Sequence, residues 1–399
     1  MQSVIIGGNQ AGQRLDKFLR KLLPEAGTGF LYKMLRKKNI TLNGRKAEGS
    51  ELLSQGDKVC FFFSDETFDK FAGKSRMAEK FEPTLRIGTA VKTEMSMKYE
   101  TTNFHITSLL KEYSRAYQEL KGVKVIYEDE HVLILDKPAG MLTQKASGGD
   151  ISLNEWMIGY LLERDPSFAT ELDTFHPSVC NRLDRNTSGL VLCGKSLAGL
   201  QFLSHCIRER SIRKFYRTIC VGKLKEPALV KGYLSKDRNR NRVSINMTLT
   251  ESGRPNATLT EIQRTGDDRP VVVNKDKPLA VSSVSASDGG EYIETAYRPI
   301  CIGDQYTLLE VELITGKPHQ IRAHLAGLGH PLIGDFKYGN TKVNRNLQKT
   351  YGLEHQLLHA FRVEFPETEE PAGLKLSGRV ITAPCPKQFE QIQKALELS

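Results

Sequence analysis

The stretch VKVIYEDEHVLILDKPAGML, residues 123–142, contains two apolar runs on either side of the acidic segment EDE, and it ends at a Pro-Ala-Gly turn. Runs of this kind predict two strands around an acidic turn. Further along, strand-like segments such as LVLCGK and RKFYRTICVG mix with helical ones such as SLAGLQFLSHCIRER. Because the pattern lacks the regular βαβ alternation of a doubly wound sheet, it predicts an α+β fold with a mixed, mainly antiparallel sheet.

The composition is that of a soluble globular protein with a basic surplus. The chain has 399 residues, 39% hydrophobic and 26% charged, so we expect two or more domains. The net charge of +10 favours a polyanionic partner, nucleic acid before membrane. No apolar run approaches the roughly 18 residues of a membrane helix, and the first residues lack a secretory-signal pattern. Seven scattered cysteines without a CxxC pair argue against zinc ribbons and disulfide frameworks, so a cytoplasmic protein is expected.

Half of the net charge lies near the N-terminus. Residues 1–65 contain eleven Lys or Arg and six Asp or Glu, a net charge of +5. Within them RLDKFLRKLL and FLYKMLRKKN have helical spacing, and the strands ITLNG and KVCFFF follow, with a turn at Asn43-Gly44. The basic residues gather at the junction of the second helix and this turn. A solvated basic face is the ordinary explanation, and phosphate binding is the functional one.

This N-terminal stretch resembles the alpha-L motif, a small RNA-binding module first known from ribosomal small-subunit protein four. QRLDKFL, the second helix, ITLNGRKA and GDKV match it in order. The resemblance implies a small α/β RNA-binding domain at residues 1–65. The RNA-binding residues that we predict in it are Arg14, Lys17, Arg36, Lys37, Lys38, Arg45 and Lys46.

Two polar stretches interrupt the remainder of the chain. Residues 66–121 are predicted to be a linker, in which HITSLLKEYSRAYQELKG forms one helix. Residues 122–399 form the larger predicted domain, with a loose insertion near residues 250–290.

Two pattern matches suggest chemistry that the surrounding residues do not support. GLVLCGKS fits the phosphate-loop pattern GxxxxGK[ST], but its inner residues look like a strand rather than a flexible loop. His319, His324 and His330 cluster, but His319 and His324 are five residues apart and lack an acid at metal-ligand spacing. We therefore predict neither a phosphate loop nor a metal site.

Three polar clusters remain that composition does not explain. NRLDRNTSGL places Asp184 between Arg182 and Arg185. An arginine nearby holds a carboxylate ionised, and an ionised Asp can act as nucleophile or base. The segment RKFYRT contains Tyr216 in a basic strand, and LITGKPHQIRAHLAGLGHPLIGDFKYG contains Arg322. Taken singly, each cluster has a structural explanation as a turn, an edge strand or a helix start.

Together the three clusters resemble the RluA family of pseudouridine synthases. That family carries HRLDRxTSGL, a Lys-x-Tyr strand, and TGRxHQIR followed by GHPLxGDxxYG; all appear here in order, between DKPAGM and LLHAFRVEFP. The resemblance implies that Asp184 is the catalytic aspartate of uridine-to-pseudouridine isomerisation and that Arg322 pairs with it. It also implies that Tyr216 lies against the uracil and helps to move a proton, while Arg182 supports the gap left by the flipped uridine. Whether Asp184 attacks the sugar or the base, or removes a sugar proton, stays open.

The resemblance also predicts the substrate contacts and the substrate class. The substrate-binding residues expected beside the catalytic ones are Arg182, Arg185, Lys214, His319 and Gln320. Since isomerisation consumes nothing, no cofactor is expected. The expected partner is structured RNA, with large-subunit (23S) ribosomal RNA ranked before transfer RNA, and the expected oligomeric state is a monomer. The sequence departs from the family pattern at Asn181, Asn186 and Lys317.

Two other classes of function are also compatible with these residues. A non-catalytic RNA-binding assembly factor could retain the same fold, although an intact Asp184, Tyr216 and Arg322 argue against it. A hydrolase or glycosylase that uses the same aspartate would release free uracil, whereas isomerisation leaves the mass of the RNA unchanged.

Overall fold

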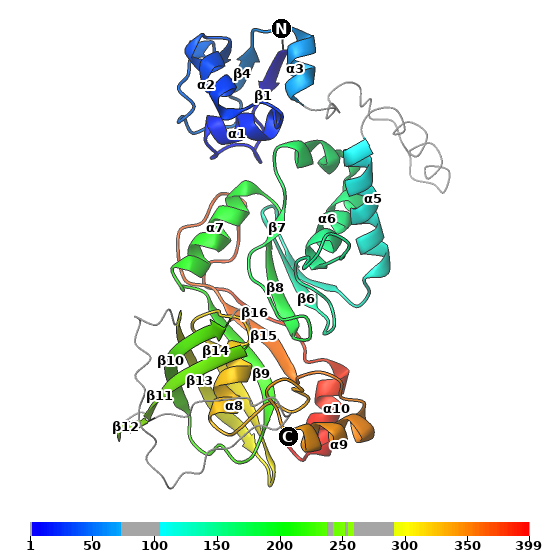
Figure 1. Cartoon of the computed structure of the whole chain (residues 1–399), viewed down its shortest axis with the longest axis vertical. Helices are drawn as coiled ribbons and strands as arrows, with labels where there is room; N and C mark the ends of the chain where they lie inside the picture. The colour runs from blue at the N-terminus through cyan, green and yellow to red at the C-terminus, as the bar shows by residue number, and fades with distance from the viewer. Residues whose placement is uncertain (1, 73–103, 238–241, 252–253, 259–290, 399) are drawn as a thin grey trace.

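The computed structural model describes residues 2–72, 104–237, 242–251, 254–258 and 291–398. Figure 1 shows a small N-terminal unit at one end of an elongated chain, followed by a larger unit built on one long sheet. The elements of the small unit are β1 (Gln2–Ile5), α1 (Leu15–Leu22), α2 (Thr28–Arg36), β2 (Ile40–Leu42), β3 (Arg45–Lys46), β4 (Lys58–Phe61) and α3 (Asp65–Phe71).

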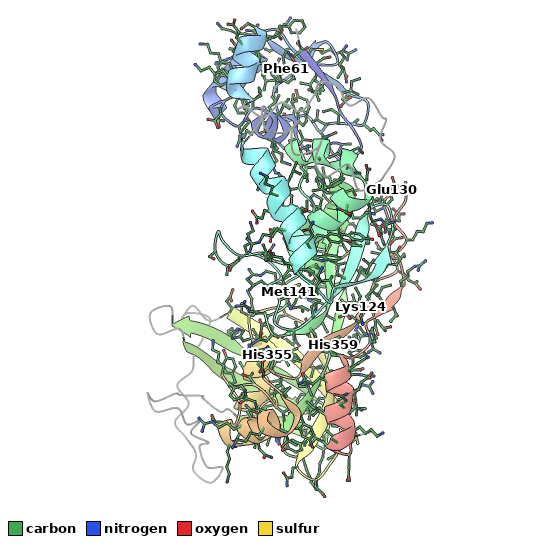
Figure 2. All side chains as sticks on the ribbon, turned by 90° about the vertical axis from the view of Figure 1, so that its right-hand side faces the viewer. Phe61, Lys124, Glu130, Met141, His355 and His359 are labelled. Carbon is green, nitrogen blue, oxygen red and sulfur yellow. The ribbon has the colours of Figure 1, made fainter. Side chains whose placement is uncertain are left out.

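The small unit, called the N-terminal module below, contains the helices and the hairpin that the sequence predicts. Its four strands pair antiparallel in the order β1-β4-β2-β3. Asn43 and Gly44 both have positive φ, 51° and 73°, as the tight turn between β2 and β3 requires. Phe18 and Phe61 are fully buried in its core, and Figure 2 labels Phe61. Phe68 of α3 belongs to the same core, so the module continues beyond residue 65.

The segment predicted as a linker is helical at both ends. It begins with α3 and closes with α5 (Phe104–Glu119), where the sequence predicts one helix. Residues 73–103, and residues 259–290 of the expected insertion, lie outside the described residues. Helix α5 packs on α6 (Leu153–Arg164), where Gly159 leaves room for the backbone of Tyr113.

The larger unit is built on one long sheet. Its strand order is β12-β11-β10-β13-β14-β9-β15-β8-β6-β5, with β16 beside β15 and β7 beside β8. The strands are β5 (Lys124–Glu128), β6 (Val132–Lys137), β7 (Ser178–Val179), β8 (Ser188–Gly194), β9 (Arg213–Val221), β10 (Ala228–Asp237), β11 (Arg242–Glu251), β12 (Arg254–Thr258), β13 (Glu291–Ile302), β14 (Tyr306–Leu313), β15 (Leu358–Glu364) and β16 (Val380–Thr382). Among the described pairs only β15 and β8 run parallel, which confirms the prediction of a mainly antiparallel α+β fold.

The remaining helices lie against this sheet and at its ends (Figure 1). They are η1 (Pro166–Asp173), α7 (Leu197–Arg208), α8 (Gln320–Gly327), α9 (Thr341–Tyr351) and α10 (Lys387–Ala395). No helix among the described residues is long and apolar enough to cross a membrane.

The parallel pairing of β15 with β8 joins the two halves of the sheet. Gly189 has φ +114°, and a side chain there would collide with the carbonyl of Ala360, so the approach of β15 requires glycine. Beside it the Ser188 hydroxyl lies 2.9 Å from Nδ1 of the fully buried His359 (Figure 2). Residues 190–193 are buried inside β8, so GLVLCGKS is a strand here and not a phosphate loop. β15 thus lies between β8 and β9, and the loop before β8 lines a pocket together with Tyr216 of β9.

Candidate active site

Asp184 lies in the loop that precedes β8, and buried groups hold this loop in place. The backbone of Leu183 exchanges hydrogen bonds with the buried Thr143 hydroxyl, at 2.9 Å and 3.2 Å. The amide of Thr187 donates to the Asp184 carbonyl at 3.0 Å. The side chain of Asp184 is 24% exposed, so the carboxylate is accessible while its backbone is fixed.

Lys137 is a second support of the loop, and the sequence did not single it out. Its ammonium is fully buried and donates to the carbonyls of Pro138, Met141 and Arg185, at 3.0, 2.8 and 3.1 Å. Burial lowers the pKa of Lys137 to about 7, although the charges of Asp184 and Asp136 act in the opposite direction. The DKPAGM segment is therefore tied to the aspartate loop by one side chain.

Arg322 joins Asp184 to a third residue, Asp335. Its Nη1 donates to Asp184 Oδ2 at 3.0 Å, while Nε and Nη2 donate to the two oxygens of Asp335 at 2.7 and 3.0 Å. Asp335 is fully buried and also accepts from the amides of Lys337 and Tyr338. Burial by itself would lower the pKa of the Arg322 guanidinium. The hydrogen bonds and charges of Asp335, and then of Asp184, outweigh the effect of burial and raise this pKa. The contact between Asp184 and Arg322 expected from the sequence is present, and Asp335 anchors it.

His319 approaches Asp184 from the other side. It caps α8 in the left-handed conformation, with φ 57°, and its Nε2 lies 3.9 Å from Asp184 Oδ2. Nδ1 faces the Tyr338 hydroxyl at 2.9 Å and the Lys337 ammonium at 3.4 Å. Since an ammonium can only donate, Nδ1 is the acceptor and the neutral ring carries its proton on Nε2, towards Asp184. The pKa of His319 is lowered, which favours the neutral ring. Burial is the main cause; the charge of Asp184 acts in the opposite direction, and the charges of Arg322 and Lys337 lower the pKa further.

Tyr216 lies on β9 and is almost fully buried against the same pocket. Burial, and then the charge of Asp184, raises the pKa of Tyr216, so the phenol keeps its proton at neutral pH. Lys214, two residues earlier, faces the same side of the strand. Burial, and then Arg210, lowers the pKa of Lys214. The pocket is lined by Arg182, Leu183, Asp184, Thr187, Tyr216, Leu313, Lys317, His319, Gln320, Ile321, Arg322 and Leu358.

The other residues predicted to bind substrate differ in their surroundings. Arg182 is exposed and lines the pocket, whereas the exposed Arg185 donates to the carbonyl of Gly140 at 3.1 Å. Gln320 is buried, and its amide contacts only protein atoms among the described residues: it accepts from Thr315 and the Lys317 amide, and donates to Glu294 and Thr295. Its geometry is that of a support for the turn before α8.

The basic residues predicted in the N-terminal module are all on its surface. Lys17, Arg36, Lys37, Lys38, Arg45 and Lys46 are exposed, and the exposed Arg14 pairs with Asp16 at 3.1 Å. Asn9 and Gln10 of the module bond to Glu171 and Thr174 of the larger unit, the latter at 2.9 Å. Among the described residues, no group of three or more His, Cys, Asp or Glu is placed to hold a metal ion.

Residues 131–327 match the family model described as RNA pseudouridylate synthase. The chain carries an RNA pseudouridylate synthase domain. It is thus a pseudouridine synthase, as the resemblance implied. The matched range contains Asp184, Tyr216, His319 and Arg322, and Asp335 lies just beyond its end.

Relatives that are named as pseudouridine synthases match along nearly the whole chain. The ribosomal large subunit pseudouridine synthase C of Vibrio vulnificus is 26% identical, covering 100% of this chain and 98% of the relative. The protein of the same name from Rickettsia typhi is 26% identical over 92% of this chain and 93% of its own. A solved structure, Human RNA Pseudouridylate Synthase Domain Containing 4, has 20% identity and a TM-score of 0.46, covering 74% of this chain and 98% of that one.

Proposed function

We propose that this synthase isomerises uridines of large-subunit ribosomal RNA, with Asp184 as the catalytic carboxylate. The observation that carries the proposal is the geometry around Asp184. This carboxylate is accessible at a pocket, paired with a buried arginine, and adjacent to a buried tyrosine. The ribosomal substrate is supported by the names of the relatives that match nearly the whole chain.

In the proposed reaction the bond from ribose C1′ to uracil N1 breaks, the uracil turns, and C1′ bonds to C5, which then loses its proton. Asp184 stays ionised because Arg322 donates to it, and an ionised carboxylate can start the reaction by attack or by proton removal. We assign Tyr216 to the face of the uracil. Because its phenol is protonated, it can accept the C5 proton only while passing its own proton to a base, and Asp184 faces it.

The target uridine must leave its stack to reach this pocket. The pocket has a volume of about 50 Å³, well below the roughly 300–1,000 Å³ of a pocket that holds a small molecule. A base therefore enters only when side chains at the mouth move. Arg182 is the exposed arginine there, and we propose that its planar guanidinium moves into the RNA stack as the base enters.

We further propose that the N-terminal module is an alpha-L-type RNA-binding domain that holds the ribosomal RNA through its exposed basic residues. The support is the order of two helices and a hairpin together with the positive charge at their junction. We also propose that the enzyme acts as a monomer in the cytoplasm, a reducing compartment in which its seven free cysteines stay unpaired.

The central test compares the parent with Asp184→Asn, which keeps the shape of the side chain and removes its charge. We expect the variant to fold and bind RNA but to form no pseudouridine in single-turnover assays read by carbodiimide derivatisation. Free uracil released by the parent would instead indicate a glycosylase, and appreciable turnover by the variant would exclude Asp184.

The substrate is tested by mapping pseudouridines in total RNA from a deletion strain and its parent. The proposal predicts that sites are lost from large-subunit ribosomal RNA. Loss from transfer RNA alone would overturn the ribosomal assignment and leave the chemistry of Asp184 untouched.

A further inference from the structure

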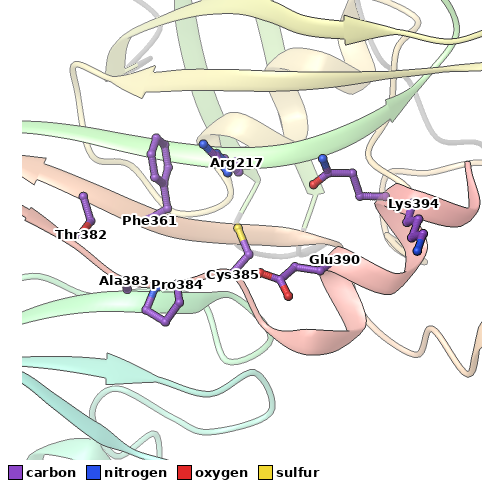
Figure 3. A pocket seen from close by; sticks show the side chains of 9 residues that line it. Arg217, Phe361, Thr382, Ala383, Pro384, Cys385, Glu390 and Lys394 are labelled. Carbon is purple, nitrogen blue, oxygen red and sulfur yellow. The ribbon is translucent and has the colours of Figure 1, made fainter. Parts of the chain in front are cut away.

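The face of the long sheet opposite the catalytic pocket carries a second cavity. Tyr216 and Arg217 are neighbours on β9, so their side chains point to opposite faces of the sheet. Tyr216 lines the catalytic pocket, and Arg217 lines a cavity of about 670 Å³ between β9, β15 and the C-terminal segment. In Figure 3 Arg217 points into this rear cavity, beside Phe361 and towards Cys385.

The other arginines around Arg217 on this face have acidic partners. The pairs are Arg213 with Glu312 at 2.8 Å and Glu364 at 2.9 Å, Arg298 with Glu310 at 2.8 Å, and Arg362 with Glu310 at 3.3 Å and Glu364 at 3.3 Å. The register of the strands places Arg217 opposite Glu310, the carboxylate that two of these arginines already hold. Among the described residues, no carboxylate lies within ion-pair distance of Arg217.

The surroundings of Arg217 leave part of its guanidinium unsatisfied. Its central carbon lies 4.6 Å from the centroid of the Phe361 ring. The guanidinium also acts on the thiol of Cys385: burial raises the pKa of this thiol, and the charge of Arg217 opposes the rise. Its Nε is buried and has no hydrogen-bond partner in the described part of the chain. A buried donor without an acceptor costs free energy, and an acceptor supplied by a ligand removes that cost.

The rest of the rear cavity fits an oxyanion. Lys394 of α10 adds a second cation, while Glu390 is the one acid among the lining residues, so the lining is net positive. Thr382 and Gln393 add polar side chains. A guanidinium presents its donors in a planar fork that matches the oxygens of a phosphate.

We propose that the rear cavity binds a phosphodiester group of the RNA substrate, away from the target uridine. The inference rests on the RNA substrate of the proposed function. Because the two pockets open on opposite faces of one sheet, a strand that ends at the catalytic pocket does not reach Arg217. The RNA must continue around the domain, so large structured RNA reaches a binding site that a short stem-loop does not.

The first experiment measures how the affinity for RNA depends on salt. The double variant Arg217→Gln, Lys394→Gln is compared with Arg345→Gln, Lys349→Gln, which removes the same charge from exposed positions of α9. On a long ribosomal RNA fragment the rear-cavity variant should lower the log–log salt slope by about 0.7 to 1.8, because one or two phosphates are no longer neutralised. On a short stem-loop containing the target uridine, affinity and single-turnover rate should match the parent.

An equal slope change on both RNAs, or an equal change in the α9 variant, would overturn the proposal. The short stem-loop also separates this inference from the proposed function, because pseudouridine formation there depends on Asp184 and not on Arg217. If the parent protein itself formed no pseudouridine in the short stem-loop, that result would count against the proposed function.

The second experiment uses the parent protein, so it does not depend on how a variant folds. Cys385 lines the rear cavity and is half-buried, and Cys301 on β13 is a half-buried comparison. Bound long RNA should slow alkylation of Cys385 severalfold and leave Cys301 unchanged, whereas the short stem-loop should protect neither. Protection by inorganic phosphate without protection by long RNA would identify a site for a free anion and refute the RNA contact, as would no protection at all.

Discussion

Asp184 and Asp335 share one guanidinium. Arg322 donates one hydrogen bond to Asp184 at 3.0 Å and two to Asp335 at 2.7 and 3.0 Å, and Asp335 is completely buried. The buried carboxylate therefore fixes the plane and the rotamer of the arginine, and the arginine in turn aims at the accessible carboxylate. Asp335 acts on the reaction through Arg322 and is a positioning residue.

Asp335→Asn leaves the residues Asp184 and Arg322 themselves unaltered, but it should lower the single-turnover rate. A hydrogen bond to a charged group contributes about 1.5–3 kcal/mol, so we expect a loss of roughly ten- to a hundredfold. The free energy of unfolding should also fall, because the buried charge of Arg322 loses half of its compensation. Asp304→Asn, at a fully exposed carboxylate, is the control. A parental rate in Asp335→Asn would remove the positioning role.

Tyr216→Phe removes the hydroxyl group and keeps the aromatic ring, so it tests the role of the hydroxyl alone. If the phenol relays the C5 proton, this variant should release tritium from [5-³H]uridine RNA at least about a hundredfold more slowly than the parent. Its affinity for RNA should be unchanged, because the ring remains. Tyr216→Leu should also weaken binding of the flipped nucleotide. Tritium release at the parental rate in Tyr216→Phe would leave Tyr216 as a stacking surface only.

Lys137 should make the stability of the fold depend on pH. Its pKa falls from 10.5 to about 7 on folding, so between these values the unfolded chain binds more protons than the folded one. The contribution of Lys137 to the free energy of unfolding must therefore rise with pH across this window, by at most about 1.4 kcal/mol per pH unit. Urea denaturation of the parent and of Lys137→Met, from pH 6 to about pH 10, should show this difference. If the difference in free energy of unfolding between the two proteins did not change with pH, the lowered pKa of Lys137 would be contradicted.

Removal of the N-terminal module should weaken RNA binding more than chemistry. Because Phe68 and Ala72 belong to the core of the module, the deletion should cover residues 1–72. The salt slope should become shallower by about 0.7–0.9 for each phosphate that the shortened protein no longer neutralises, while the remaining chain still converts a short RNA at high concentration. Replacement of the residues of one basic cluster, Arg36, Lys37 and Lys38, by Gln is the matched variant with an intact fold. An unchanged slope in both would show that the basic cluster is only a solvated face.

Local patterns in the sequence determined much of this protein. Alternating apolar runs predicted the antiparallel strands, helical spacing predicted α1, α2 and α5, and Asn43-Gly44 predicted the turn that the positive φ angles confirm. These features depend on residue types at short separation, which the sequence displays directly. The contact between Asp184 and Arg322 was expected only from the resemblance of the motifs to a family.

The tertiary structure alone decided which groups complete the site. Asp335, the buried Lys137 and the missing partner of Arg217 were not predicted, because each depends on which polar groups face one another across the fold. Asp184 and Arg322 are 138 residues apart in sequence, and β8 and β15 meet only because Gly189 lacks a side chain. Aspartates and lysines are ordinary surface residues in any sequence. Burial turns them into positioning groups, since a buried charge must find a partner or lose its charge.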